Sequence, residues 1–163
     1  MTVFKRPALP LAGGCACGGI RYEITAMPLL LYACHCTDCQ RRTGSAFALN
    51  MPVVAKEFHI LRGEPKRWHH TSPTGVAVAS WFCRDCGGRL YGERAGRREI
   101  VNLRAGTLDD TTWLVPVAHI FMRSAQPWIL PAANAECHET RPDDFRLLAE
   151  RWRAMWPEFF PQK

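Results

Sequence analysis

Short apolar-rich stretches recur along this chain, and glycine and proline residues separate them. Runs of four to eight such residues between turn signals are typical of β-strands. The pattern therefore predicts an all-β domain. We expect its strands at residues 20–24, 29–34, 47–54, 58–61, 76–82, 100–103 and 117–121.

The C-terminal part of the chain has a longer hydrophobic period. Asp143 precedes this part and is placed to cap the start of a helix. We therefore expect one amphipathic C-terminal helix that packs on the sheet, with Trp152 and Trp156 in the core or in a dimer contact. The apolar positions spaced three or four residues apart are Phe145, Leu148, Trp152 and Met155.

The length and the distribution of apolar residues predict one soluble domain. A chain of 163 residues that is 47% hydrophobic can bury one sizeable core. The longest apolar run, at residues 27–34, is far shorter than the roughly 20 residues that a membrane helix needs. The apolar stretch near the N-terminus contains Pro10 and is too short for a signal peptide. We expect a cytoplasmic protein that does not bind membranes.

The net charge of +6 suits an anionic partner, which could be a nucleic acid, a phosphorylated metabolite or a small thiol that carries carboxylates. Segments that bind nucleic acid usually contain a block of like charge. Here the arginines are dispersed, with short doublets at Arg41-Arg42 and Arg97-Arg98. We therefore expect a small anionic molecule rather than a nucleic acid as the partner.

Seven of the eight cysteines fall into three closely spaced motifs, and Cys137 stands alone. Disulfides are one reading of such a set, but they seldom persist in the reducing compartment expected here. Metal ligation is the better interpretation. The motifs are C-x-C at Cys15 and Cys17, C-x-C-x-x-C at Cys34, Cys36 and Cys39, and C-x-x-C at Cys83 and Cys86.

The first and third motifs predict one closed zinc site. Side chains two apart in a strand face the same side, so a strand would let Cys15 and Cys17 share an ion. Around Cys83 and Cys86 the sequence has the form of a zinc knuckle, in which the following glycine takes a positive φ. Four thiolates from distant segments would tie the fold together, so the ion would contribute folding free energy.

The second motif, Cys34, Cys36 and Cys39, supplies three thiolates from one short segment. Three protein ligands leave one position of a zinc ion open, which is typical of catalytic rather than structural zinc. The alternative is a second structural site completed by Cys137, His35 or His119. His119 lies in an apolar strand, so we expect it to be a core histidine. The alternative is that it lines the reactive site.

These motifs and their neighbours resemble the family of glutathione-dependent formaldehyde-activating enzymes, which includes the centromere protein V type domain. The resemblance covers about residues 10–130. The residues beyond about 131 depart from the family core, so the single domain is expected to have its core at 10–130 and a helical extension at 131–163. The resemblance rests on Gly14–Gly18, Cys34–Ser45, Phe82–Gly87, Gly106–Asp110 and the pattern from Pro116 through His119 to Pro127-Trp128.

The resemblance implies a β-tent zinc-binding fold with two zinc ions per chain. It implies an enzyme of the carbon–sulfur lyase class that forms S-hydroxymethylglutathione from formaldehyde and glutathione. The C-terminal extension could cover the reactive zinc, which leaves substrate access open. It could instead form a dimer contact, which leaves a homodimer open. By motif, the structural ligands are Cys15, Cys17, Cys83 and Cys86, and the catalytic ligands are Cys34, Cys36 and Cys39.

The residues after the triplet are candidates for substrate binding. Arg41 and Arg42 could hold a substrate carboxylate, because a guanidinium offers two parallel donors to it. Ser45 and Thr43 could donate hydrogen bonds near the metal. The alternatives are solvated surface charge for the arginines and a simple turn around Gly44.

Two function classes follow from the sequence. The first is a zinc-dependent enzyme that joins a thiol to an aldehyde. The second is a non-catalytic zinc-binding module, or a carrier of the thiol adduct, that binds a partner, because thiols add to formaldehyde without any catalyst.

Overall fold

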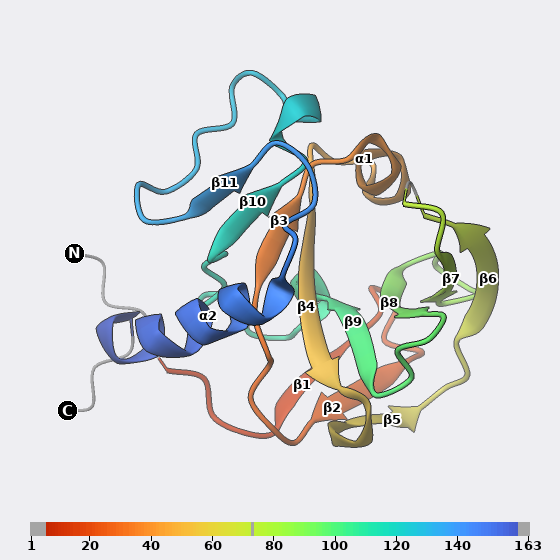
Figure 1. The fold of residues 1–163 in the computed structure, drawn as a ribbon. Helices are drawn as coiled ribbons and strands as arrows, with labels where there is room; N and C mark the ends of the chain where they lie inside the picture. The colour runs from red at the N-terminus through yellow and green to blue at the C-terminus, as the bar shows by residue number, and fades with distance from the viewer. Residues whose placement is uncertain (1–5, 73, 160–163) are drawn as a thin grey trace. The chain divides into compact units, whose positions relative to one another are not determined.

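The computed structural model describes residues 6–72 and 74–159, and strands form most of its regular structure (Figure 1). The chain divides into two structural units. The first unit contains Leu29–Asn50 and the chain from Thr112 onward, and the second contains Pro7–Pro28 and Met51–Thr111. Strand β4 (Ala48–Val54) belongs to both units, because the division falls after Asn50.

The first unit has a short mixed sheet. Strand β10 is parallel to both of its neighbours, and β3 is antiparallel to β4. All residues of β3 and β10 are buried, as expected for short strands in the middle of a sheet. The register places Ile120 beside Cys34. The strand order is β11 (Glu136–His138), β10 (Ala118–Ile120), β3 (Tyr32–Cys34) and β4.

The second unit continues from β4 into antiparallel strands and adds a separate three-stranded sheet. In β2 the fully buried Tyr22 and Ile24 alternate with half-buried residues, as in a strand that covers a core on one side. The small sheet has the order β1 (Leu11–Gly14), β2 (Arg21–Ile24) and β5 (Phe58–Arg62). After β4 the larger sheet continues with β9 (Ile100–Arg104), β8 (Arg89–Arg94), β7 (Ala77–Phe82) and β6 (Lys66–Thr71).

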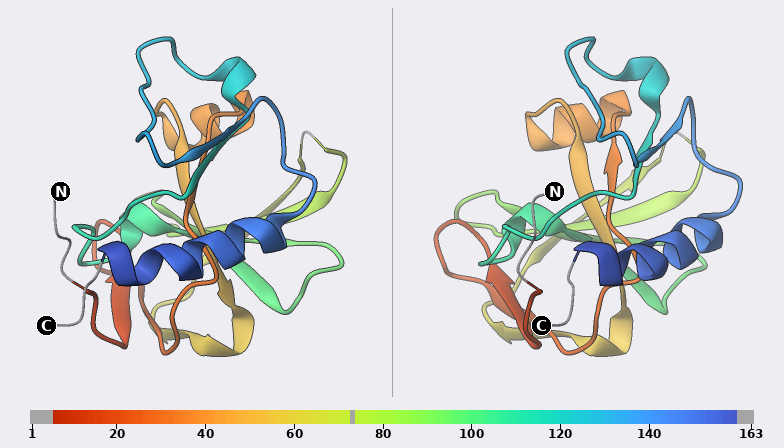
Figure 2. Two further views of the ribbon diagram at one scale, coloured as in Figure 1. Left: turned by 60° about the vertical axis from the view of Figure 1, so that its left-hand side comes forward. Right: turned by 90° about the vertical axis from the view of Figure 1, so that its left-hand side faces the viewer.

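Helix α2 (Phe145–Phe159) forms part of the core of the first unit and is one continuous helix in both views of Figure 2. The Trp152 ring meets the Trp156 ring edge-on with centroids 5.5 Å apart, and Trp156 lies 6.2 Å from Trp113. The Phe145 ring lies 5.3 Å from that of Tyr32 at the other end of the helix. Among residues 145–156, the part of α2 whose burial the structure describes, the buried side chains are Leu148, Trp152 and Met155.

The other helices are short. Helix α1 (Thr37–Thr43) follows β3 in the first unit, and the single-turn helix η3 (Met122–Ser124) follows β10. In the second unit, the single-turn helix η1 (Ala55–Glu57) follows β4 and the single-turn helix η2 (Ala105–Thr107) follows β9. The chain between η3 and β11 forms a loop that projects beyond the strands in Figure 2.

The predicted mostly-β class with a C-terminal helix is confirmed, and three details of the prediction were wrong. Asp144, not Asp143, caps α2, because its Oδ1 accepts a hydrogen bond from the Arg146 backbone at 2.8 Å. Helix α1 was not expected. Strands β1, β6, β8 and β11 were missed, since β1 ends in two glycines, β6 is an exposed edge strand of mostly polar residues, β8 contains Gly92 and β11 has only three residues.

No helix in the part of the chain that the structure describes combines the length and the apolar character needed to span a membrane.

The single-domain interpretation predicts one cooperative unfolding transition, because β4 contributes residues to both units and cannot be lost from one alone. Urea unfolding followed by far-ultraviolet circular dichroism and by tryptophan fluorescence should give coincident curves. Two separated transitions would show that the units are independent domains.

Substituting Trp152 by alanine should lower the free energy of unfolding by about 3–5 kcal/mol, because the side chain is 2% exposed and its removal leaves a large cavity. The control is Leu147→Ala on the same helix, where the side chain is 63% exposed and a change within about 0.5 kcal/mol is expected. Similar losses for both variants in chemical denaturation would contradict a core role for Trp152.

Candidate metal centres

The first cysteine motif lies in the tight loop between β1 and β2, not in a strand as expected. The Cys15 N–H donates to the Ile20 carbonyl at 3.1 Å, and the Gly18 N–H donates to the Cys15 carbonyl at 3.0 Å. Gly18 has a φ of 73°, which a glycine adopts at little cost. The turn brings the sulfurs of Cys15 and Cys17 to 3.4 Å, closer than an extended segment would.

The third motif forms the predicted knuckle between β7 and β8. The Cys83 N–H donates to the Gly88 carbonyl at 2.9 Å, and the Gly87 N–H donates back to the Cys83 carbonyl at 3.0 Å. Gly87 has a φ of 70°, as expected for the glycine after Cys86. At Gly88 an added Cβ would lie 3.3 Å from the Cys86 sulfur, so a side chain there would crowd the cluster.

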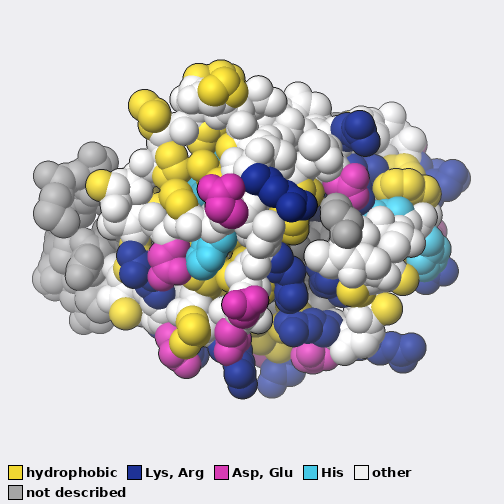
Figure 3. Space-filling view, turned by 45° about the horizontal axis from the view of Figure 1, so that its top comes forward, with side chains coloured by type: hydrophobic (Ala, Val, Ile, Leu, Met, Phe, Trp, Pro, Cys, Tyr) yellow, Lys and Arg dark blue, Asp and Glu magenta, His cyan; other side chains and the backbone are white. Residues whose placement is uncertain are grey.

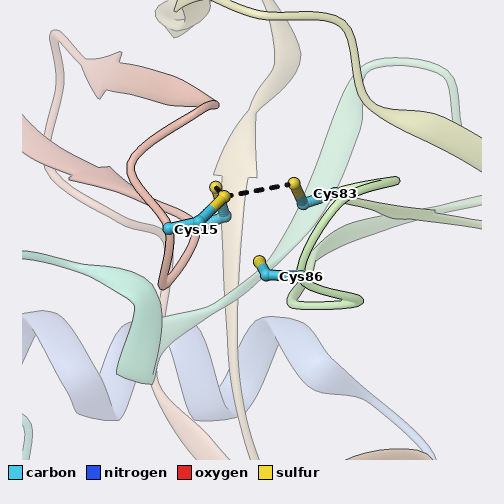
Figure 4. A group of neighbouring side chains, drawn as sticks. Cys15, Cys83 and Cys86 are labelled. Carbon is cyan, nitrogen blue, oxygen red and sulfur yellow. Dashed lines mark hydrogen bonds between the residues drawn. The ribbon is translucent and has the colours of Figure 1, made fainter.

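The two loops bring four sulfurs together, all within 4.8 Å of one another. Figure 4 shows the sulfurs of Cys15, Cys83 and Cys86 turned toward one another, and the Cys17 and Cys83 sulfurs are 3.7 Å apart. A tetrahedral zinc ion with Zn–S bonds near 2.3 Å would space its sulfurs by about 3.8 Å. The donor set and its spacing therefore fit a closed four-cysteine metal site.

Backbone N–H groups around these sulfurs favour the thiolate, which is the form that binds metal. The N–H groups of Cys17 and then Gly88 lower the pKa of Cys86 to about 6. Burial opposes ionisation of Cys15, but hydrogen bonds, first from the Ile20 N–H at 3.2 Å, leave its pKa below the ordinary value. The Gly19 N–H also favours the Cys17 thiolate, but hydrogen bonds with the other three thiols raise the pKa of Cys17 to about 12. Metal binding at this cluster would therefore displace the Cys17 proton near neutral pH.

The second cluster is formed where β3 passes into α1. Cys34 ends the strand, and Cys36 caps the helix, with its sulfur accepting from the Cys39 N–H at 3.4 Å. The first helical turn places Cys39 near Cys36, so the helix explains the C-x-x-C spacing. All three side chains are buried, and their sulfurs lie within 4.8 Å of one another.

The three buried thiols depend on one another for ionisation. Hydrogen bonds from Cys34 and then Cys39 lower the pKa of Cys36 to about 2. Hydrogen bonds to Cys36 and Cys39 raise the pKa of Cys34 far above its ordinary value, and burial adds to the effect. Ionising one sulfur therefore suppresses ionisation of the next, so three thiolates can coexist here only around a cation. The cluster fits a metal ion.

No further cysteine, histidine or carboxylate within residues 6–72 and 74–159 joins the three sulfurs at this range. Cys137 is exposed on β11. His35 and His119 are both buried and bind each other, with His35 Nε2 2.9 Å from His119 Nδ1. Burial lowers the pKa of both imidazoles. His119 is thus a core histidine with a hydrogen-bond partner.

The predicted substrate-binding residues differ in their surroundings. Arg42 forms an ion pair with Asp38 one helical turn away, at 2.8 Å, and its side chain is 14% exposed. Arg41 and Ser45 are exposed, and Arg41 forms no ion pair with any residue that the structure describes. Thr43 donates to the Cys39 carbonyl at 2.8 Å, so its hydroxyl serves the helix. Arg41 is the arginine better placed to receive an anion.

Sequence reasoning missed two polar residues that surround the second cluster. Gln40 and Ser124 both donate hydrogen bonds to the His35 carbonyl, which lies between two of the cysteines. Of the two, only Gln40 could have been suspected from the sequence, because it directly follows Cys39. Ser124 lies 89 residues from His35, so no spacing rule could join them.

On the face shown in Figure 3, lysines and arginines are interspersed with acidic, histidine and hydrophobic side chains. A mixed surface of this kind differs from the continuous basic stripe that follows a nucleic-acid backbone.

The match to a family model extends over residues 10–124 and includes both cysteine clusters. The chain belongs to the family of glutathione-dependent formaldehyde-activating enzymes, as the sequence motifs predicted. A Sordaria macrospora protein named "Putative glutathione-dependent formaldehyde-activating enzyme" is 27% identical over 92 residues. That match covers 53% of this chain but only 38% of the relative.

Among solved structures, a crystal structure of a Rhodobacter sphaeroides protein is similar to this chain. The TM-score is 0.49 at 22% sequence identity, and the match covers 62% of this chain and 90% of the other.

Substituting Cys86 by alanine should remove one metal equivalent and unfold the domain, because the remaining three thiols lose the closed site that joins the two loops. The control is Cys137→Ala, an exposed cysteine outside both clusters, which should keep the wild-type metal content and melting temperature. Metal analysis and calorimetry provide the test. A Cys86→Ala protein with native melting and full metal content would contradict the assignment.

Proposed function

We propose that this chain is a zinc-dependent enzyme of the carbon–sulfur lyase class that forms S-hydroxymethylglutathione or a related adduct of a thiol and an aldehyde. Family membership supports the reaction type. The observation that carries the proposal is the buried cluster of three cysteines, which no fourth ligand closes within the described residues.

The two clusters would hold zinc ions with different roles. Cys15, Cys17, Cys83 and Cys86 would hold a structural zinc ion, and Cys34, Cys36 and Cys39 a reactive one. When bound at the second cluster, zinc would offer an open coordination position at which a thiol loses its proton more easily.

In the proposed reaction the sulfur of the thiol attacks the aldehyde carbon. A carbon–sulfur bond forms, the C=O π electrons move to oxygen, and the proton that leaves sulfur ends on the new hydroxyl. No oxidant or reductant is consumed. The buried cysteines of the second cluster would keep bulk water away from this step, and the exposed Arg41 would bind a carboxylate of the thiol substrate.

Several finer expectations belong to the same proposal. The β-tent arrangement and the cytoplasmic location follow from family resemblance and from the cysteine-rich composition. The partners would be a glutathione-like thiol and an aldehyde, without nucleic acid. Residues 131–163 would provide a homodimer contact if one forms.

A carrier or a non-catalytic zinc module is the second candidate. The loop after η3 favours it, because Trp128 is 67% exposed and Leu130 is 90% exposed. Large apolar side chains exposed together often mark a protein contact. A carrier would present the adduct to another enzyme and would not accelerate its formation.

The variants Cys36→Ala and Cys39→Ala should remain folded with about one zinc per chain but lose acceleration of adduct formation. The triplet lies within one short segment, so its ion closes almost no loop and its loss should cost little stability. Exchange NMR of formaldehyde and glutathione should show wild-type turnover above the uncatalysed rate, and zinc analysis should show the missing ion.

Two results would contradict these assignments. If both variants unfold as Cys86→Ala is expected to, the second cluster is structural. If the wild type holds two zinc ions but never exceeds the background rate with any thiol, the enzyme proposal fails and the carrier takes its place.

A further inference from the structure

His35 lies between Cys34 and Cys36, and its backbone N–H and carbonyl take part in three hydrogen bonds. Its N–H donates to the Ile120 carbonyl at 2.9 Å. Its carbonyl accepts from Gln40 Nε2 at 2.7 Å and from Ser124 Oγ at 3.0 Å. In a C-x-C segment the peptide planes of the middle residue decide where the flanking side chains point, so these bonds fix the directions of Cys34 and Cys36.

The Gln40 side-chain amide makes hydrogen bonds through both its nitrogen and its oxygen. The second N–H of its amide donates to the Ser124 carbonyl at 2.7 Å, and its Oε1 accepts from Gln126 Nε2 at 3.2 Å. A primary amide offers two N–H donors and one carbonyl, so each part of this group has a partner. Gln40 directly follows Cys39, and the amide therefore fastens α1 to a segment 84 residues away.

The segment that Gln40 binds, which follows β10 and contains Ser124, has a bend in its backbone. Phe121 has a φ of 58°, a left-handed conformation that is uncommon for a bulky residue. The Ser124 Oγ also lies 3.1 Å from the Phe121 carbonyl oxygen, so the hydroxyl can share its proton between this carbonyl and the His35 carbonyl. This bend after β10 presents both the hydroxyl and the carbonyl of Ser124 toward the cysteine segment.

We propose that Gln40 and Ser124 are positioning residues that set the three thiols of the second cluster in a metal-binding arrangement before any ion enters. The inference rests on the proposed function, because it assumes that this cluster binds metal. Neither residue belongs to the ligand cluster. Their effect is indirect: they fix the peptide between Cys34 and Cys36 and the helix that carries Cys39. Groups of this kind behind metal ligands commonly change metal affinity by 10–100-fold.

The test uses Co²⁺ binding to the full chain, followed by the thiolate-to-cobalt charge-transfer absorbance during competition with a chelator. Wild type should bind two ions, and Cys39→Ala identifies which step belongs to the second cluster. Gln40→Met keeps the side-chain length but removes both donors, so the affinity of the second cluster should fall about 10–100-fold. Ser124→Ala should cause a smaller loss, because Gln40 still holds the His35 carbonyl.

Gln126→Ala is the matched control, since it removes only the longer contact to Gln40 Oε1 and should change the affinity by less than about threefold. The first cluster serves as an internal reference, and its affinity should be unchanged in all variants. Equal losses at both clusters, or a loss in Gln126→Ala as large as in Gln40→Met, would overturn the inference.

Two further outcomes separate this inference from the proposed function. If wild type binds one ion only, at the first cluster, the proposed function fails. If wild type binds two ions and Gln40→Met releases the second no more readily than wild type, the function stands and the positioning role is wrong.

Discussion

Four sulfurs from two loops that are distant in the sequence lie within 4.8 Å of one another, and this convergence joins the β1–β2 loop to the β7–β8 loop in the second unit. Thiols at this distance cannot all ionise without a cation between them. The hairpins on either side hold the loops in place through regular strand pairing. The Tyr22 hydroxyl, 2.7 Å from Thr107 Oγ1, and the ion pair of Arg21 with Asp109 further fix the β1–β2 hairpin within the unit.

In both clusters several thiols lie close together and oppose each other's ionisation, but their surroundings differ. The first uses turns that supply backbone N–H groups to Cys15 and Cys86 and encloses its centre with four ligands. The second buries three sulfurs in one segment, where Cys34, Cys36 and Cys39 oppose each other's ionisation. A closed set of ligands suits a stabilising ion, whereas an incomplete set suits an ion that meets a substrate.

The local chemistry of the candidate site could be predicted from the sequence. The C-x-x-C knuckle with its following glycine gave the conformation of Gly87, and the apolar spacing gave helix α2. Helix α1 was missed, because seven residues between two turns carry little periodic signal. The turn at Cys15 and Cys17 was also missed, since alternation along a strand explained the same spacing equally well.

What the sequence could not provide were the contacts made across the fold. The cap of α2 moved from Asp143 to Asp144 because two adjacent acidic residues are equivalent as sequence signals. The edge strand β6 has an exposed, polar sequence that carries no hydrophobic alternation. The Gln40 and Ser124 contacts with His35 depend on β10 lying parallel to β3, a pairing that no local pattern contains.

In the proposed arrangement one cluster is closed by four protein ligands and the other keeps one position open. Anomalous diffraction at the zinc edge, from crystals grown with and without glutathione, tests it most directly. We expect two zinc peaks per chain, one among Cys15, Cys17, Cys83 and Cys86, and one bound by Cys34, Cys36 and Cys39 with a non-protein atom that glutathione sulfur replaces. A single peak, or a second ion closed by a fourth protein ligand, would contradict the account.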